Sequence, residues 1–290
     1  MPGSPDSRET GTKEGALSPE ELDQRRRVAE EAAKAAAAVH RRYFGAGLSA
    51  RTKNDNPRDL VSQADVESQA AAKAVIEAAF PGEAILGEED EGALQAGDGR
   101  LEACWLIDPL DGSFSFLHDF PFFASTVCWV ESGLPLAGCV YATMQDEMFA
   151  VAAGRGATLN GQPISIRRRR PLAEAVLGLP AARSPEGIAA LTRLITAVQG
   201  VRIFLPSSLT LSYIACGRLD AAATLMPLRQ MGPWDIAAGA LLVEEAGGAV
   251  GSHGGAPFDL RSKGYVGASS SGLLRQLVEA GQIAPEDGLG

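Results

Sequence analysis

The feature that most constrains the fold is a change of pattern along the chain. Residues 18 to 45 and the stretch after Asp65 are rich in alanine and charged residues, which is typical of long surface helices. From about residue 84 the sequence turns into short apolar runs separated by turn residues, which predicts strands. After residue 171 apolar runs alternate with helical stretches, as in an α/β unit. The pattern therefore predicts a fold of mixed α+β and α/β character.

Two helices are predicted in the N-terminal part. The first begins at Ser18, because Ser18-Pro19-Glu20-Glu21 combines a capping box with proline at the first helical position, and it runs to Gly45. The second follows Asp65 and is stopped by Pro81-Gly82. A polar loop, residues 51 to 59, is expected between them.

The strand-rich part is predicted to form a largely antiparallel sheet faced by the two helices, because its spacers include hairpin sequences such as Asn160-Gly161. The expected strands are Ala84–Leu86, Cys104–Ile107, Thr126–Val130, Gly138–Tyr141, Met148–Val151 and Ile164–Ile166. In the C-terminal part, helices are expected at about 186–199, 208–216 and 234–246, and strands at 201–205, 220–224 and 248–250.

Length and composition set the domain organisation. The chain has 290 residues, and a domain averages roughly 150, so two halves or one large domain are expected. Residues 1–17 are polar and predict a disordered tail. Residues 18–170 are expected to form an N-terminal α+β half with the antiparallel sheet, and residues 171–290 a C-terminal α/β half, together making one catalytic unit.

Charge and cysteine content exclude several classes of partner. The net charge of −10 argues against a nucleic acid polymer or an anionic membrane. The sequence has neither an apolar run long enough for a membrane span nor a signal peptide, so we expect a cytoplasmic protein. The four cysteines form no C-x-x-C pair, which disfavours zinc and disulfides. The basic run Arg167–Arg170 is interpreted as a solvated strand end.

A strand that ends in carboxylates gives the most informative chemical signal. The run Trp105–Ser113, WLIDPLDGS, joins an apolar strand to two carboxylates, a glycine and a hydroxyl. Its proline keeps the chain out of a ladder and its glycine permits a tight turn, so Asp108, Asp111 and the carbonyl of Leu110 could converge. Mg²⁺ prefers such oxygens and leaves positions for water and phosphate. The run therefore predicts a site for phosphate chemistry.

Three other interpretations of this run make different demands on its residues. An Asp-Gly pair after an apolar run is also a common turn signal. An EF-hand is excluded, because a loop starting at Asp108 would have Leu110 and Gly112 at positions that need oxygen-bearing side chains. A covalent aspartyl-phosphate is disfavoured, because haloacid-dehalogenase-like phosphatases place the two carboxylates two residues apart rather than three.

Two further acidic segments occur in matching contexts. Glu88 follows the predicted strand Ala84–Leu86, and Asp235 stands in the first turn of a predicted helix. Each is weak by itself, because acidic residues are common in loops and at helix starts. Together with Asp108 and Asp111 they predict a binuclear metal site, since two divalent ions need several bridging carboxylates.

These residues stand in an order that resembles the inositol monophosphatase family of magnesium-dependent, lithium-sensitive phosphatases. Asp59–Asp65 is similar to D-L-V-T-x-x-D, and Ile85–Glu89 to I-x-G-E-E. Trp105–Phe123 is similar to W-x-I-D-P-I-D-G-T-x-N-F-x-H-x-x-P-x-F, and Trp234–Gly239 with Glu245–Gly248 to the C-terminal signature. Gly255–Leu260 extends the resemblance, which covers about residues 22 to 280.

The resemblance implies a layered αβαβα sandwich and a phosphomonoesterase that uses two or three Mg²⁺ ions per subunit. The implied metal ligands are Glu88, Asp108, the carbonyl of Leu110, Asp111 and Asp235. The implied catalytic residues are Asp65, Ser113 and Glu88, with Asp65 and Ser113 orienting and deprotonating a metal-held water for in-line attack. No phosphoenzyme is expected. The implied substrate contacts are Asp111, Gly112, Ser113 and Asp235, with Arg229 as a candidate contact.

Departures from the family pattern leave the substrate open. Ser113 keeps the hydroxyl of the usual threonine, whereas Ser115 replaces an asparagine, and Thr224 aligns with a glutamate that contacts inositol. The substrate is therefore a small phosphorylated alcohol, with inositol phosphate, histidinol phosphate, a sugar phosphate and a nucleotide 3'-phosphate as candidates. The alternative is a non-catalytic relative that binds a phosphometabolite. The resemblance also favours a homodimer.

Overall fold

The structure, a computed structural model, describes residues 17–53, 56–90, 101–166, 169–203, 206–228 and 231–285, with the backbone alone for 53 and 56–59. The predicted disordered tail therefore lies outside the described residues except for Leu17. Of the run Arg167–Arg170, the described residues are Arg169 and Arg170.

The two N-terminal helices form where the sequence predicts them. Helix α1 spans Pro19–Tyr43; the Ser18 side chain accepts a hydrogen bond from the backbone N–H of Glu21, and the Glu21 side chain accepts one from that of Ser18. This confirms the predicted capping box. Helix α2 spans Gln63–Ala79 and starts two residues before Asp65, because Ser62 forms its N-cap.

The predicted polar loop between the helices is wrong. Strand β1 (Ala50–Lys53) and strand β2 (Asn56–Ser62) pair as an antiparallel hairpin. Residues 50–52 are exposed, so this strand carries no alternation of apolar and polar side chains. The pairing of β1 with β2 is seen in the backbone register, whereas the exposed side chains of residues 50–52 carry no pattern that predicts a strand.

A seven-stranded sheet has the order β3-β4-β5-β6-β7-β8-β9, in which β3 and β4 are parallel and every other pair is antiparallel. Its strands are β3 (Ile85–Gly87), β4 (Ala103–Asp111), β5 (Ala124–Glu131), β6 (Leu134–Ala142), β7 (Glu147–Ala152), β8 (Gly156–Leu159) and β9 (Gln162–Ile164). The largely antiparallel sheet predicted from the sequence is confirmed.

A five-stranded sheet has the order β11-β10-β12-β14-β13, with β11, β10 and β12 parallel and the last two pairs antiparallel. Its strands are β10 (Val176–Leu179), β11 (Gly200–Ile203), β12 (Ala221–Ala223), β13 (Ala249–Ser252) and β14 (Tyr265–Ala268). The helices are α3 (Ser113–Leu117), α4 (Pro185–Ala197), α5 (Ser207–Ala215), α6 (Pro233–Glu245) and α7 (Ser271–Gly281), with 3-10 turns η1 (Leu172–Glu174) and η2 (His253–Gly255). Strands β8, β10 and β14 and helices α3 and α7 were not predicted.

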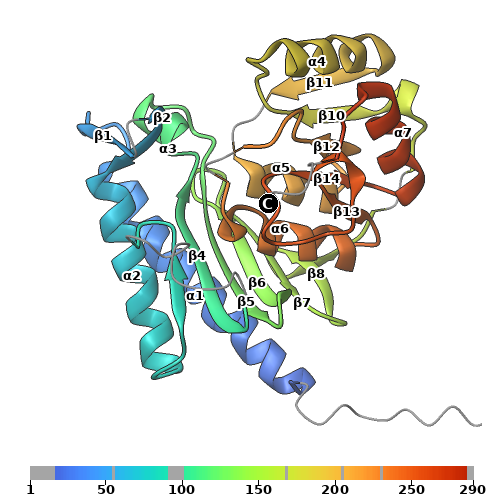
Figure 1. Cartoon of the computed structure of the whole chain (residues 1–290). Helices are drawn as coiled ribbons and strands as arrows, with labels where there is room; N and C mark the ends of the chain where they lie inside the picture. The colour runs from blue at the N-terminus through green and yellow to red at the C-terminus, as the bar shows by residue number, and fades with distance from the viewer. Residues whose placement is uncertain are drawn as a thin grey trace, which may run out of the picture.

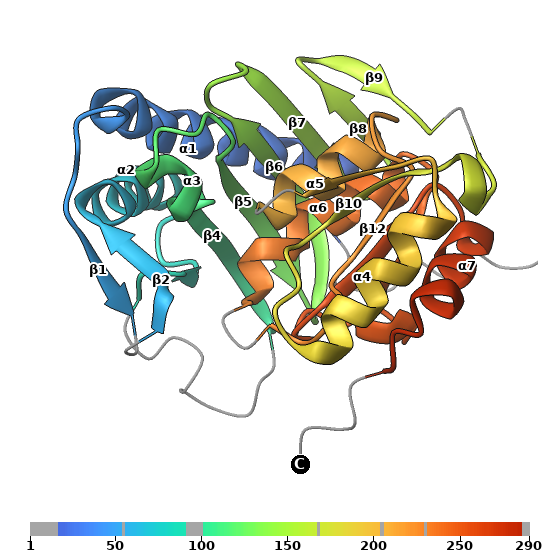
Figure 2. The same cartoon turned by 90° about the horizontal axis from the view of Figure 1, so that it is seen from above.

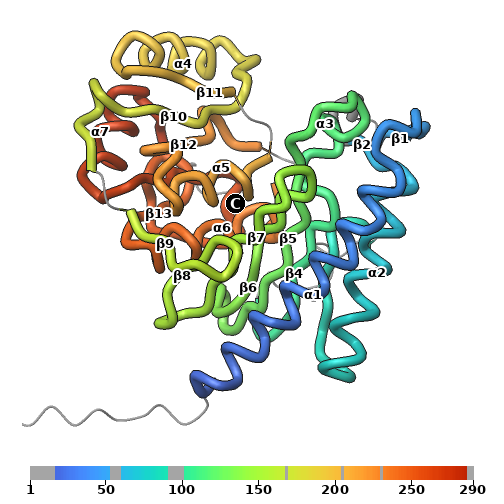
Figure 3. The backbone as a smooth tube through the Cα atoms, turned by 180° about the vertical axis from the view of Figure 1, so that it is seen from behind, coloured from blue at the N-terminus to red at the C-terminus, as the bar shows by residue number. Residues whose placement is uncertain are grey.

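The elements stack in five layers, helix, sheet, helix, sheet, helix, which confirms the predicted αβαβα sandwich (Figures 1 and 2). Helices α1 and α2 cover one face of the seven-stranded sheet, α5 and α6 lie between the sheets, and α4 and α7 cover the outer face of the smaller sheet, as the tube seen from behind also shows (Figure 3). Three apolar cores fill the four interfaces between these layers, because one of them reaches both sheets around α5 and α6. None of the helices in the described part of the chain is long and apolar enough to span a membrane.

Candidate metal centre

A β-bulge at the end of β4 places two carboxylates on one side of the sheet. In a regular strand, residues three apart point to opposite faces. Here Asp108 pairs with Thr126 and Asp111 with Ala124, so three steps along β4 match two steps along β5. Because Thr126 and Ala124 share a face of β5, Asp108 and Asp111 also share a face. Pro109 occupies the bulge, where its missing N–H costs no ladder hydrogen bond.

Gly112 turns the chain from β4 into the short helix α3. Its φ is 100° and its ψ 35°, a left-handed conformation that glycine adopts without strain. A Cβ atom at this position would lie 2.9 Å from Cγ of Pro206 and 3.1 Å from the carbonyl oxygen of Phe122. The turn therefore needs glycine for its backbone angle and for the space around it.

Ser113 and Asp65 meet next to this turn. The Ser113 hydroxyl lies 2.8 Å from Oδ1 of Asp65 and 3.0 Å from the carbonyl oxygen of Leu110, so its single proton is donated to one of two acceptors. Oδ2 of Asp65 accepts from the backbone N–H of Ser62 at 2.8 Å and from its hydroxyl at 2.7 Å. The capping box of α2 thus fixes the Asp65 carboxylate against Ser113.

Glu88 reaches the same region from the neighbouring parallel strand. Gly87, the last residue of β3, pairs with Ile107, and the backbone N–H of Glu88 donates to the carbonyl oxygen of Ile107 at 3.0 Å. Glu88 therefore lies next to Ile107, the residue immediately before Asp108. Its negative charge contributes to raising the pKa of both Asp65 and Asp108, so the structure brings it into the group.

Asp235 completes the group from a third direction. It stands in the first turn of α6, and its Oδ2 accepts a hydrogen bond from the backbone N–H of Gly232 at 2.6 Å. One carboxylate oxygen from each of Asp108, Asp111 and Asp235 lies within 4.8 Å of the others. The strand end and the helix start predicted from the sequence therefore converge.

The hydrogen bonding of the carboxylates suits a divalent cation. Asp108 is 1% exposed; its Oδ1 accepts from the backbone N–H of Leu110 at 3.0 Å, whereas among the described residues Oδ2 has no hydrogen-bond partner of good geometry. A buried carboxylate oxygen without a donor is costly unless a cation lies nearby. Hard oxygens clustered at this spacing are the donor set that Mg²⁺ prefers.

The negative charge of the cluster also favours a bound cation. Burial, followed by the negative charges of Glu88, Asp111 and Asp235, raises the pKa of Asp108 well above its usual value. Burial also raises the pKa of Asp111 to about 7, although hydrogen bonds from Ser208 act in the opposite direction. Like charges held together in a buried site bind protons in the absence of a cation, and a cation supplies the missing positive charge.

Of the two other residues that the sequence analysis names, the structure describes Thr224. Arg229 lies outside the described residues. Thr224 is 2% exposed, and its hydroxyl lies 3.0 Å from Nδ1 of His253 and 3.3 Å from the carbonyl oxygen of Tyr265. This hydroxyl is therefore buried and hydrogen-bonded within the protein, and the alignment of Thr224 with an inositol-contacting glutamate of the family stays a prediction.

Ser208 also hydrogen-bonds one of these carboxylates. Its backbone N–H donates to Oδ2 of Asp111 at 2.9 Å, and its hydroxyl donates to the same oxygen. Asp111 lies 97 residues away in the sequence, in the seven-stranded sheet, so spacing along the chain could not predict this hydrogen bond. The contact depends on how α5 packs between the two sheets.

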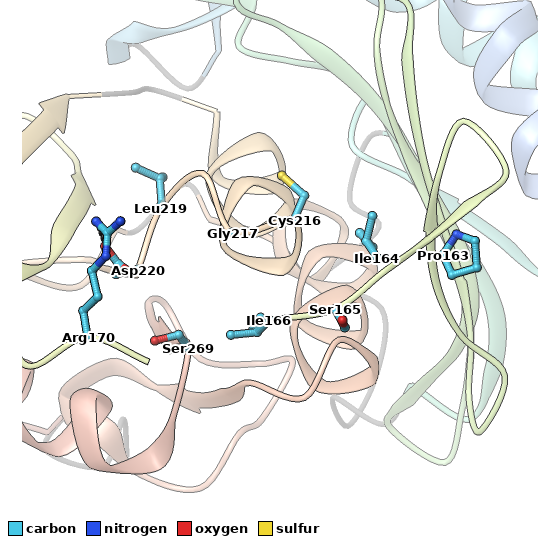
Figure 4. Close-up of a pocket in the computed structure, with 10 residues that line it drawn as sticks. All are labelled: Pro163, Ile164, Ser165, Ile166, Arg170, Cys216, Gly217, Leu219, Asp220 and Ser269. Carbon is cyan, nitrogen blue, oxygen red and sulfur yellow. Dashed lines mark ion pairs between the residues drawn. The ribbon is translucent and has the colours of Figure 1, made fainter. Parts of the chain in front are cut away.

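A pocket of about 310 Å³ lies apart from the carboxylates, between the end of β9 and the C-terminal end of α5 (Figure 4). Arg170 and Asp220 line it and form an ion pair, with Nη1 3.5 Å from Oδ2. Asp65, Glu88, Asp108, Asp111 and Asp235 do not line this pocket. The chemistry of the carboxylates therefore belongs to the sheet junction, not to this hollow.

A layered αβαβα sandwich in which carboxylates converge where two sheets and α6 meet fits the class of metal-dependent phosphatases. The comparison with known proteins agrees. The chain matches the inositol monophosphatase family over residues 21–285 and belongs to that family. It is 31% identical to inositol monophosphatase 1 of Solanum lycopersicum over 263 residues, which cover 89% of this chain and 94% of that protein.

Other relatives and solved structures give the same result. The chain is 32% identical to the inositol-1-monophosphatase of Bacillus subtilis over 237 residues, or 80% of this chain and 86% of that protein. The structure of an inositol monophosphatase from Anabaena superimposes with a TM-score of 0.75 at 31% identity, covering 91% of this chain and 98% of that chain. The suhB protein of Bartonella henselae gives 0.78 at 29% identity, with the same coverage. This chain is therefore a phosphatase, a phosphoric monoester hydrolase of the inositol monophosphatase family.

Proposed function

We propose that this phosphatase hydrolyses the phosphate monoester of a small polyol, such as inositol monophosphate, and that it requires Mg²⁺. The observation that carries the proposal is the meeting of Asp108, Asp111 and Asp235 oxygens within 4.8 Å. One buried Asp108 oxygen there has no hydrogen-bond donor of good geometry among the described residues. The names of the relatives support an inositol phosphate as the first substrate to test.

The proposed metal ligands are the carboxylates of Glu88, Asp108, Asp111 and Asp235 and the carbonyl oxygen of Leu110. Asp108 is the proposed ligand shared between two ions, because it is buried and the negative charges of Glu88, Asp111 and Asp235 all act on it. Bound Mg²⁺ in such a site neutralises phosphate charge and activates water. Whether two or three ions bind stays a prediction, which isothermal titration calorimetry would test.

Ser113 and Asp65 are the proposed proton-handling pair. The Ser113 hydroxyl lies 2.8 Å from Oδ1 of Asp65 and can pass its proton to that carboxylate while its oxygen accepts a proton from an attacking water. Asp65 cannot rotate away, because Ser62 holds its other oxygen through two hydrogen bonds. Glu88 is proposed to assist by adding negative charge beside this pair. The reaction needs no covalent phosphoenzyme, because the attacking group is water.

The phosphate is proposed to bind at the turn after β4. The first backbone N–H groups of α3, beginning at Gly112 and Ser113, lack partners within the helix and favour an anion. Asp111 and Asp235 are proposed to lie beside the bound substrate, next to the metal ions that they hold. The Arg229 contact stays a prediction.

Phosphate release from a panel of esters tests the proposal. Inositol 1-phosphate, glycerol 2-phosphate, histidinol phosphate and adenosine 3',5'-bisphosphate are compared with Mg²⁺ and with excess EDTA. We expect the two polyol phosphates to be hydrolysed with Mg²⁺ and no ester to be hydrolysed in EDTA. Full turnover in EDTA would exclude the metal requirement, and a preference for the bisphosphate would exclude the polyol.

Three further expectations stay predictions. Analytical ultracentrifugation would test the homodimer, and cell fractionation the cytoplasmic location. Expression of residues 18–170 alone would test whether the two halves act as one catalytic unit. If they do, this fragment has no activity, because it lacks Asp235.

A further inference from the structure

Ser208 connects the C-terminal sheet layer to the carboxylates at the end of β4. It is the second residue of α5 and is fully buried, at 0% exposed. Both of its donors, the backbone N–H at 2.9 Å and the hydroxyl, point to Oδ2 of Asp111. One residue of the helix layer thus donates two hydrogen bonds, one from its backbone and one from its side chain, to the same oxygen of an aspartate in the neighbouring sheet.

Two donors on one oxygen fix the orientation of a carboxylate. With Oδ2 held by Ser208, the Asp111 side chain cannot turn about its last bond without breaking two hydrogen bonds in a buried place. Its Oδ1 is then the oxygen that Ser208 does not hold. Asp108 differs, because its Oδ2 has no hydrogen-bond partner of good geometry among the residues that the structure describes. Ser208 thus fixes one oxygen of Asp111, whereas Asp108 accepts a hydrogen bond through its Oδ1 from the backbone N–H of Leu110.

We propose that Ser208 is a positioning residue for the metal centre: it orients Asp111 so that one carboxylate oxygen is kept for a cation. The inference rests on the proposed metal-dependent function. Groups that orient a metal ligand through hydrogen bonds typically change metal affinity by about 10- to 100-fold when they are removed. Removal of the Ser208 hydroxyl is therefore expected to raise the dissociation constant for Mg²⁺ about 10-fold.

A matched control lies one turn further along the same helix. Ser212 is also fully buried, and its hydroxyl donates to the carbonyl oxygen of Ser208 at 2.8 Å rather than to a carboxylate. Ser208→Ala and Ser212→Ala each remove one buried hydroxyl from α5. A change in helix packing affects both variants, whereas a change in the orientation of Asp111 affects the first alone.

Isothermal titration with Mg²⁺, in the absence of substrate, measures the effect on the wild type and both variants. We expect Ser208→Ala to weaken Mg²⁺ binding about 10-fold and Ser212→Ala to stay within about twofold of the wild type. Equal affinities for Ser208→Ala and the wild type, or an equal loss in both variants, would overturn the proposal.

Crystal structures of the wild type and Ser208→Ala grown in EDTA provide a readout that needs no metal. We expect the Asp111 carboxylate to change its side-chain torsion in the variant, and an unchanged torsion would overturn the positioning role. A wild type that binds no Mg²⁺ while the torsion changes in Ser208→Ala would refute the proposed metal dependence and leave the role of Ser208 supported.

Discussion

The buried histidine behind the end of β4 should make stability depend on pH. His40 of α1 is 0% exposed; its Nε2 lies 2.8 Å from the carbonyl oxygen of Pro109, and its Nδ1 lies 2.9 Å from Oγ1 of Thr143. A carbonyl oxygen only accepts, so Nε2 carries the proton and Nδ1 accepts from the Thr143 hydroxyl. The neutral ring therefore satisfies both nitrogens and anchors the residue that follows Asp108.

The sign and size of the effect follow from the two pKa values. Burial lowers the pKa of His40 from 6.5 to about 4. Between these values the unfolded chain binds a proton that the folded chain does not, so the contribution of His40 to stability is complete above pH 6.5 and is lost as the pH falls towards 4. The complete loss corresponds to about 3 kcal/mol, of which about 2 kcal/mol is lost at pH 5.

Urea denaturation at pH 8 and pH 5, in EDTA, measures this loss. His40→Gln replaces the ring with an amide that can donate and accept but does not titrate, and His118→Gln removes an exposed histidine as a control. Between the two pH values we expect the wild type and His118→Gln to lose about 2 kcal/mol more than His40→Gln. The carboxylates titrate in all three proteins, so their contribution cancels. An equal loss in the wild type and His40→Gln would refute the reasoning.

Three other substitutions test the site and the fold. Asp108→Asn should reduce Mg²⁺-dependent turnover more than Asp235→Asn, because Asp108 is proposed to bind two ions. Steady-state kinetics measure both variants, with Asp259→Asn as a surface control. A larger loss in Asp235→Asn than in Asp108→Asn would show that the assignment is wrong. Gly112→Ala should lower the thermal midpoint and the activity, since φ is 100° and the new Cβ would lie 2.9 Å from Pro206, and an unchanged midpoint would contradict this. Arg25→Met should destabilise the protein by about 3 kcal/mol, because Glu83 would lose a buried partner at 2.8 Å, whereas Arg26→Met on the same helix should cost less than about 1 kcal/mol by urea denaturation. Equal costs for the two arginines would speak against the buried pair.

Local signals in the sequence predicted the parts of the fold that local hydrogen bonds and periodicity control. The start of α1 followed from Ser18 and Glu21, because a capping box closes within one helical turn. The hairpin of β1 and β2 was missed, because its exposed first strand forms by backbone pairing and carries no side-chain pattern.

The sequence also predicted the carboxylates themselves, since Asp108 and Asp111 stand at a predicted strand end and Asp235 stands at a predicted helix start. Their meeting within 4.8 Å was not visible from spacing alone, because Asp108 and Asp111 would point to opposite faces of a regular strand. The resemblance to the family supplied that expectation, and the bulge opposite β5 supplies the physical reason.

Tertiary structure alone decided which other groups reach the carboxylates. Ser208 binds Asp111 across the boundary between two layers, and His40 reaches the carbonyl of Pro109 from α1, 69 residues away in the sequence. Thr224 lies against His253, 29 residues further along the chain, which is another contact that spacing in the sequence does not predict. Sequence determines which chemical groups are present and the local turn of chain that carries each one. Which of them touch depends on strand register and layer packing, and these are set by contacts between distant residues.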